Sequence, residues 1–205
     1  FLVMFTSWGM SQGTFGVLLK PLTEETGWSR TAASAAFSIH VTVSLVVGVM
    51  WGWLSDKIGV RKVLIATGIL LGAGTYLAGI VTSMWQLYFY YGFIGGIGLG
   101  GTAGPVTSVA SRWFEKSRGL VVGIGFAGGT LGTALLAILA EFLISNYGWR
   151  FAFQILSYFI WGGFLVGVII LRNPRDEEVH VHSSRETPTS TAENLDKEDS
   201  SLKAA

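Results

Sequence analysis

Six long apolar stretches, separated by short charged or turn-forming breaks, follow one another along the first 171 residues of the chain. A helix needs roughly 20 mainly apolar residues to cross a bilayer core about 30 Å thick, and each stretch approaches or exceeds that length. The pattern therefore predicts an all-α polytopic membrane protein with six transmembrane helices. Within a few residues, the predicted helices cover 1–19, 31–54, 62–83, 86–110, 118–143 and 150–171.

The composition of these 171 residues excludes a water-soluble protein. The chain has a mean hydropathy of +0.52 and only 13% charged residues, whereas soluble domains average about a quarter. Of the 27 charged residues, 13 fall in the last 34 positions, which leaves 14 for the first 171. So few charges cannot cover a surface that faces water.

The last 34 residues, 172–205, have a different character. They carry eight acidic and five basic residues, are rich in Ser and Thr, and contain neither Gly nor Trp. Such a segment cannot bury enough apolar surface to offset its ordering entropy, so we expect a disordered cytoplasmic tail or a linker. At the other end, Phe1 lies inside an apolar run and is not preceded by Met. We therefore expect a fragment whose natural N-terminus is missing.

Basic residues are distributed unequally between the two sets of breaks, with eight on one side and three on the other. Lys and Arg near the ends of helices are retained on the cytoplasmic side. The loops after helices two, four and six are therefore predicted to be cytoplasmic, in a multi-pass protein of the plasma membrane. The cytoplasmic set is Lys57, Arg61, Lys62, Arg112, Lys116, Arg118, Arg172 and Arg175, and the opposite set is Lys20, Arg30 and Arg150.

The fourth predicted helix combines three features. Small residues at steps of four allow helix backbones to approach closely in lipid, in a static contact or in one that slides during transport. Pro105 removes a backbone donor and should bend the helix. Aromatic residues near its outer end predict an interfacial belt. The small residues are Gly92, Gly96, Gly100 and Gly104, and the aromatic ones are Trp85, Tyr88, Tyr90 and Tyr91.

A short charged loop, residues 52–62, joins the second and third predicted helices. Gly59 allows a positive φ, and Asp56 can accept hydrogen bonds from a helix N-terminus or pair with Arg61. By charge alone the loop would be an ordinary cytoplasmic turn. Its pattern, however, resembles the loop motif of the major facilitator superfamily, Gly-x-Leu-x-Asp-x-x-Gly-x-Arg-Lys. The matching positions are Gly52, Leu54, Asp56, Gly59, Arg61 and Lys62.

Other segments resemble one branch of that superfamily, the monocarboxylate porters and oxalate/formate antiporters. Residues 15–30 are similar to its helix-one exit and outer loop, and residues 112–129 to its loop between helices four and five. Residues 147–153 resemble the start of helix six in the superfamily. Monocarboxylate carriers often have a lysine in helix one where this chain has Gly13, which argues against a lactate-like substrate.

The resemblance covers residues 1 to about 172 and implies one half of a major facilitator fold. That half is the N-terminal six helices of a twelve-helix secondary transporter, built as two inverted three-helix repeats. We expect the second six-helix bundle to be missing by truncation, the alternative being a dimer of half-transporters. In the family, the Asp and the Arg of the loop motif connect helix two to a helix of the other half. The resemblance thus implies a conformational-switch motif made of Gly52, Asp56, Gly59, Arg61 and Lys62.

Polar side chains inside the predicted helices are the candidates for a substrate path, because burying them unpaired in lipid is costly. Gln12 either lines a cavity or makes an interhelical hydrogen bond; oxalate-type members place a glutamine in that part of helix one. His40 and Ser44 share a helix face with Ala36 and Gly48, which is typical of a bundle interior. His40 is either a proton-coupling group or a neutral, hydrogen-bonded histidine.

The sequence predicts a secondary active transporter that moves a small organic anion, a monocarboxylate or dicarboxylate, by alternating access, alone or with a proton. The alternative is a transport-inactive scaffold or sensor that retains the fold. The chain has no cysteine and shows no cluster of nucleophile, base and metal ligands, so we expect no enzyme activity, cofactor or metal site. A net charge of +1 gives no support for nucleic-acid binding. The predicted partners are the substrate, the lipid bilayer and the second bundle.

Overall fold

A computed structural model describes residues 1–113 and 118–170 of the chain, without the side chains of 108–113 and 118. Every regular element in this part of the chain is helical. The segment predicted to be a tail or linker, 172–205, lies outside the described residues, as do Lys116, Arg172 and Arg175 from the predicted cytoplasmic set.

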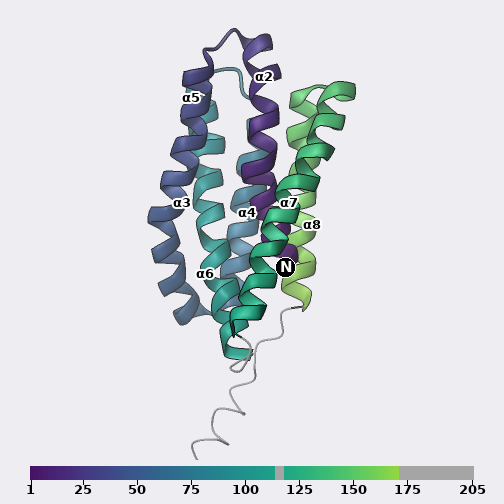
Figure 1. Ribbon diagram of the computed structural model, residues 1–205. Helices are drawn as coiled ribbons and strands as arrows, with labels where there is room; N and C mark the ends of the chain where they lie inside the picture. The colour runs from purple at the N-terminus through teal and green to yellow at the C-terminus, as the bar shows by residue number, and fades with distance from the viewer. Residues whose placement is uncertain (114–117, 171–205) are drawn as a thin grey trace, which may run out of the picture. The chain divides into compact units, whose positions relative to one another are not determined.

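Six helical stretches of membrane-spanning length run alongside one another in the described part of the chain (Figure 1). Four of them are single helices, each long and apolar enough to cross a membrane. The predicted all-α fold with six transmembrane helices is confirmed. The four are α3 (Arg30–Ile58), α4 (Val60–Ala78), α7 (Arg118–Tyr147) and α8 (Trp149–Ile170).

The first and fourth stretches each contain a π-helical segment, and we call them span 1 and span 4. A π-helix bonds i to i+5 instead of i+4, occurs often at functional sites and leaves backbone groups for other partners where it meets an α-helix. Span 1 consists of α1 (Leu2–Trp8), η1 (Gly9–Gly13) and α2 (Thr14–Thr26). Span 4 consists of α5 (Met84–Leu87), η2 (Tyr88–Gly95) and α6 (Gly96–Trp113).

The packing of the helices has the pattern of two equivalent three-helix repeats. Helix α3 packs along α6 of span 4, α7 packs along span 1, and α4 packs along α8. If stretches one, two and three are exchanged for stretches four, five and six, the pair of α3 and span 4 becomes the pair of α7 and span 1. The pair of α4 and α8 is exchanged with itself. Spans 1 and 4 are then equivalent, and each contains one π segment, near the middle of span 1 and in the first half of span 4. This is the internal symmetry expected of inverted repeats.

Glycines let the helices touch backbone to backbone at both equivalent interfaces. A Cβ at Gly96 would lie 2.7 Å from the carbonyl oxygen of His40, and one at Gly100 would lie 2.6 Å from that of Ser44. Across the other interface, a Cβ at Gly132 of α7 would overlap the carbonyl oxygen of Phe5. The glycine face predicted on the fourth helix therefore packs on α3, except at Gly104, where a Cβ would meet nothing within 4 Å.

Span 4 is kinked where the sequence predicts a bend. Gly101, with φ −89° and ψ 16°, departs from helical geometry four residues before Pro105. A proline ring collides with the carbonyl of residue i−4 and cannot donate a hydrogen bond to it, so Gly101 is the position at which the backbone must turn away.

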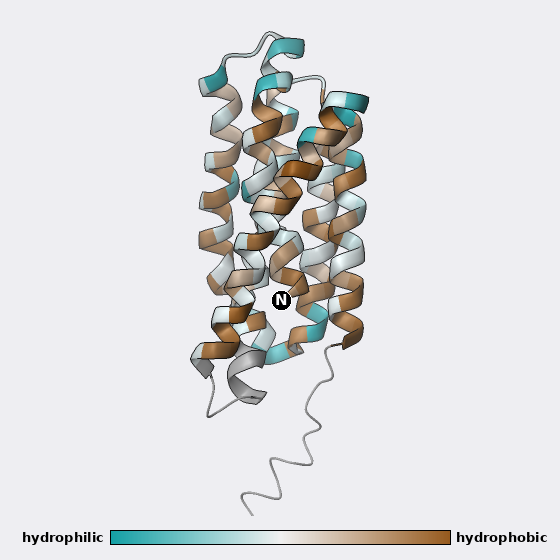
Figure 2. Ribbon diagram, turned by 45° about the vertical axis from the view of Figure 1, so that its right-hand side comes forward, coloured by the Kyte–Doolittle hydropathy of each residue, from teal (hydrophilic) through white to brown (hydrophobic). Residues whose placement is uncertain are grey.

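Polar side chains connect the helices at one end of the bundle. Hydrophobic residues cover the middle of the helices, and hydrophilic ones gather near their ends (Figure 2). At one end, Glu25 in the last turn of span 1 accepts a hydrogen bond from Trp149 Nε1 at 2.6 Å and pairs with Arg150 Nε at 3.2 Å. Arg150 also donates to the carbonyl of Val81 at 2.9 Å. Segments 15–30 and 147–153, which the sequence singled out separately, thus meet at this end.

Candidate functional site

A cavity of about 410 Å³ opens between span 1, α3 and α6. Gln12 from η1 and Ser44 from α3 bring an amide and a hydroxyl to its wall. The rest of the lining is apolar or small and includes Trp8, Leu99 and Ala103. The described residues that line it include no charged side chain. A few polar groups in an otherwise apolar wall are typical of small-molecule sites.

The two polar groups of the cavity differ in what they offer a ligand. Gln12 is exposed, and its side chain makes no hydrogen bond with any other described residue, so its amide can both donate and accept. The hydroxyl of Ser44 donates to the carbonyl of Val41 at 2.8 Å and keeps its lone pairs. Gln12 is therefore the principal hydrogen-bond donor that the described wall offers a ligand.

His40 lies one helical turn before Ser44, is buried in the bundle and is not among the residues that line the cavity. Its side chain is 1% exposed, which confirms the predicted interior position. Nδ1 lies 2.8 Å from the backbone carbonyl of Tyr91, and Nε2 lies 2.8 Å from the hydroxyl of Ser11. Because a carbonyl can only accept, Nδ1 carries a hydrogen, and in the neutral ring Nε2 accepts from Ser11.

The contacts of His40 join the π segments of the two repeats. Ser11 belongs to η1 and Tyr91 to η2, and the hydroxyl of Tyr91 donates to the backbone carbonyl of Ser11 at 3.0 Å. The three residues thus form a closed ring of hydrogen bonds. The His40 imidazole also stacks on the Tyr91 ring with centroids 4.7 Å apart, and Phe15 stacks on Tyr91 at 4.9 Å. We call His40, Ser11 and Tyr91 the central triad.

The prediction of an interfacial aromatic belt is wrong for Tyr91. Trp85 is 79% exposed, as a belt residue would be, but Tyr91 is only 3% exposed. Hydropathy cannot separate these cases, since both belong to one aromatic run and an amphipathic ring suits either position. A buried histidine needs polar partners for both ring nitrogens, and this need was the signal that could have identified Tyr91 as one partner of His40. Ser11, a polar residue beside Gln12, was a candidate for the other.

The loop motif lies at the end of the bundle where α3 passes into α4. Gly59 is the single residue between the two helices, and its φ of 90° is positive, as predicted. Its N–H donates to the carbonyl of Ser55 at 3.1 Å and caps the C-terminus of α3. Lys57 lies over the Trp53 ring, 3.8 Å from its centroid. The remaining motif positions, Asp56, Arg61 and Lys62, are exposed, and Gly52 is half-buried.

A six-helix membrane bundle with the packing of two three-helix repeats and a cavity between span 1, α3 and α6 has the architecture expected of one half of a secondary transporter. The chain belongs to the Major Facilitator Superfamily, whose family model matches residues 1–201. It is therefore a multi-pass membrane protein of this superfamily, and the resemblance found in its loop motif is confirmed.

Relatives include transporters with different named substrates. Riboflavin transporter RibJ of Trypanosoma brucei brucei is 32% identical over 145 residues, which are 70% of this chain and 26% of that protein. Monocarboxylate transporter 14 of Homo sapiens is 29% identical over 171 residues, 81% of this chain and 34% of that protein. Monocarboxylate transporter 1 of Bos taurus is 36% identical over 120 residues, 56% and 24% of the two chains.

The chain spans about a quarter to a third of the length of these curated relatives. Among solved structures, the peptide transporter POT in complex with alafosfalin superposes with a TM-score of 0.68 at 21% identity. The match covers 82% of this chain and 36% of that one. At this identity the likeness shows the fold alone.

Proposed function

We propose that the protein is a secondary active transporter that moves a small organic anion by alternating access, with Gln12 and Ser44 on the substrate path. The observation that carries this proposal is the cavity between span 1, α3 and α6, where these two residues meet. Relatives named as monocarboxylate transporters support the anion. Because the described lining holds no charged side chain, a cation from a second six-helix bundle would complete the anion site.

A second candidate substrate is an uncharged heteroaromatic compound. The riboflavin transporter among the relatives supports it, and so does the lining itself, where the Trp8 indole and the Gln12 amide are present without a cation. An indole can stack on a flat ring, and an amide can pair with ring nitrogens and carbonyls. Uptake of a labelled monocarboxylate, a labelled dicarboxylate and labelled riboflavin by the same proteoliposomes would distinguish the two candidates.

The loop motif suits a role in switching between the two orientations of the transporter. We infer that Gly52, Asp56, Gly59, Arg61 and Lys62 contact the second bundle in one orientation and separate from it in the other. The positive-inside rule supports a cytoplasmic position for the end of the helices that carries the loop motif. The membrane is proposed to be the plasma membrane. The single-residue link at Gly59 keeps the ends of α3 and α4 next to each other.

Replacing Gln12 by Leu should weaken substrate binding and leave folding intact, because the Gln12 side chain is exposed. A hydrogen bond to a charged group contributes about 1.5–3 kcal/mol, so KM for uptake should rise about 10- to 100-fold. Gln154→Leu is the matched control, as Gln154 lies on α8 and does not line the cavity. An unchanged KM in Gln12→Leu, or an equal rise in both variants, would remove Gln12 from the path.

His40 is proposed to hold the two repeats together as a neutral side chain and not to carry a coupled proton. Both of its ring nitrogens already have partners within the bundle. Glutamine can replace both contacts, because its amide donates to one partner and accepts from the other. His40→Gln should therefore transport with an unchanged dependence on external pH. Loss of the pH dependence in His40→Gln, with normal expression, would show that His40 couples a proton.

A further inference from the structure

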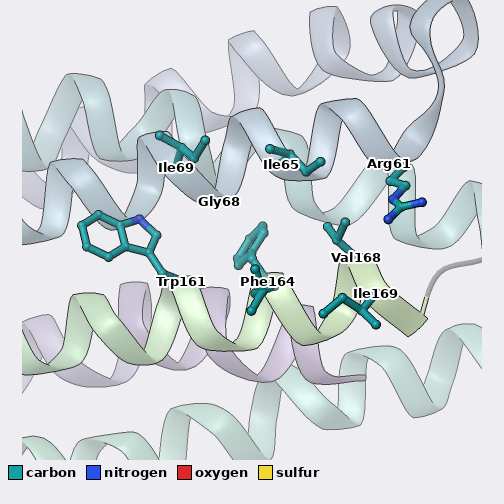
Figure 3. Close-up of a pocket in the computed structure, with 9 residues that line it drawn as sticks. Arg61, Ile65, Gly68, Ile69, Trp161, Phe164, Val168 and Ile169 are labelled. Atoms are coloured by element: carbon teal, nitrogen blue, oxygen red, sulfur yellow. The ribbon is translucent and has the colours of Figure 1, made fainter.

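A groove of about 570 Å³ runs between α4 and α8 (Figure 3) and shares no lining residue with the substrate cavity. Its lining is apolar along most of its length and ends at a single guanidinium. Figure 3 shows that the side chains of both helices face one another across the groove, with Arg61 at one end and Trp161 at the other. The residues used below are Arg61, Ile65, Ile69, Trp161, Phe164 and Leu165.

The length of the groove corresponds to one leaflet of a bilayer. Arg61, Ile65 and Ile69 follow one another at steps of four and form a stripe along α4. Eight residues of α-helix rise about 12 Å, and half of a bilayer core about 30 Å thick is about 15 Å. Arg61 lies in the first turn of α4, at the membrane edge, so the groove extends from the level of the headgroups toward the midplane.

The groove is hollow because glycines flatten the surface of α4. A Cβ at Gly68 would lie 2.5 Å from the Phe164 ring, and one at Gly72 would overlap the Trp161 indole. The two rings can therefore lie close against α4 and form the floor and the inner end. On the open side, Leu165 remains 64% exposed and Ile69 58% exposed, so no other described helix covers the groove.

We propose that this groove binds one anionic phospholipid, with its phosphate on Arg61 and one acyl chain along the apolar lining. The occupant is inferred to be anionic because the charge at the end of the groove is positive. Arg61 is the only charged residue among those that line the groove in the described part of the chain, so an anionic headgroup meets no carboxylate there. A guanidinium presents paired donors that match phosphate oxygens, and basic pockets between transmembrane helices bind anionic headgroups. The inference does not depend on the transported substrate.

Quenching of Trp161 fluorescence by brominated acyl chains tests the proposal. The protein, with any continuation that its gene encodes, is reconstituted in phosphatidylcholine with brominated chains. The difference between the protein and Trp161→Phe isolates the signal of this tryptophan from the other seven. Unbrominated phosphatidylglycerol is then added in increasing amounts, and unbrominated phosphatidylcholine is added in a parallel series. Phosphatidylglycerol should restore the Trp161 signal at a lower mole fraction than phosphatidylcholine does.

Two pairs of variants separate the headgroup contact from the chain contact. Arg61→Gln should reduce the preference for phosphatidylglycerol about tenfold, whereas Lys57→Gln, which removes a charge from the same end outside the groove, should retain it. Ile65→Phe should fill the groove and abolish quenching of Trp161 without adding a tryptophan signal. Ile138→Phe, a substitution of an equally apolar exposed residue on α7, should not. Size-exclusion profiles show that each variant is folded.

Three results would overturn the proposal. Equal restoration by the two lipids would show that the site does not select an anionic headgroup. Equal effects of Arg61→Gln and Lys57→Gln would assign the preference to the general charge of this end of the bundle. Absence of Trp161 quenching by any brominated lipid would show that another part of the protein, such as a second bundle, covers the groove.

Discussion

A single added methyl group at Gly132 should destabilise the protein by about 2–3 kcal/mol. The Cβ of an alanine there would overlap the carbonyl oxygen of Phe5, and Gly132 in turn lies against Gly9. Overpacked side chains can often rotate away, but here backbone meets backbone, and relief requires α7 to move off span 1. The Tm of Gly132→Ala in detergent should therefore fall by several degrees, and less protein should elute as a monodisperse peak.

The matched control lies on the same helix. A Cβ at Gly125 would meet nothing within 4 Å, and alanine is favoured over glycine inside a helix by about 1 kcal/mol. Gly125→Ala should thus leave the Tm unchanged or raise it slightly. Opposite signs for the two substitutions are the signature of close packing at Gly132, and equal effects would mean that α7 does not touch span 1 as described.

Replacing His40 by Leu should cost about 2–4 kcal/mol of stability. Leucine is of similar size but cannot hydrogen-bond, so the carbonyl of Tyr91 and the hydroxyl of Ser11 would be left buried without their partner. Interhelical hydrogen bonds in membranes contribute roughly 1 kcal/mol each, and an unsatisfied buried group costs more than the lost bond. The measurement is the Tm of the purified variant, compared with that of His40→Gln.

The comparison between the two His40 substitutions makes this prediction specific. Gln can restore both contacts of the central triad, so His40→Gln should recover most of the Tm lost in His40→Leu. Ser38→Ala is a suitable control on the same helix, because Ser38 is exposed. If leucine and glutamine lowered the Tm equally, the shape of the imidazole would matter and its hydrogen bonds would not.

The positions of the membrane helices follow from apolar length, but their exact extent does not. The second helix was predicted to end near residue 54, and α3 continues to Ile58. Charged residues mark the edge of the hydrocarbon and do not stop a helix, whereas Gly59 with its positive φ does. The turn chemistry of the loop motif was thus the better guide to the boundary.

The central triad could be predicted only in part. The neighbours of His40 at helical spacing indicated an interior position, but its partners lie 29 and 51 residues away. The π segments that hold both partners were not predicted, because a π-helix is a rare and short variation within an α-helix and the apolar pattern does not distinguish the two. Likewise, the inner end of the groove forms because aromatic rings of α8 pack against Gly68 and Gly72, a contact between helices that no local pattern of α4 reveals.

The central claim, that this fold carries a small organic anion, is tested most directly by counterflow. The protein, with any continuation that its gene encodes, is reconstituted in liposomes loaded with an unlabelled monocarboxylate or dicarboxylate, and entry of a trace of the labelled anion is followed. A carrier returns loaded from the inside, so internal substrate should accelerate labelled entry severalfold, and Gln12→Leu should need a higher internal concentration for the same effect. Entry that internal substrate never accelerates, for any anion tested, would contradict the account. The same result with riboflavin would favour a scaffold or sensor that has kept the transporter fold.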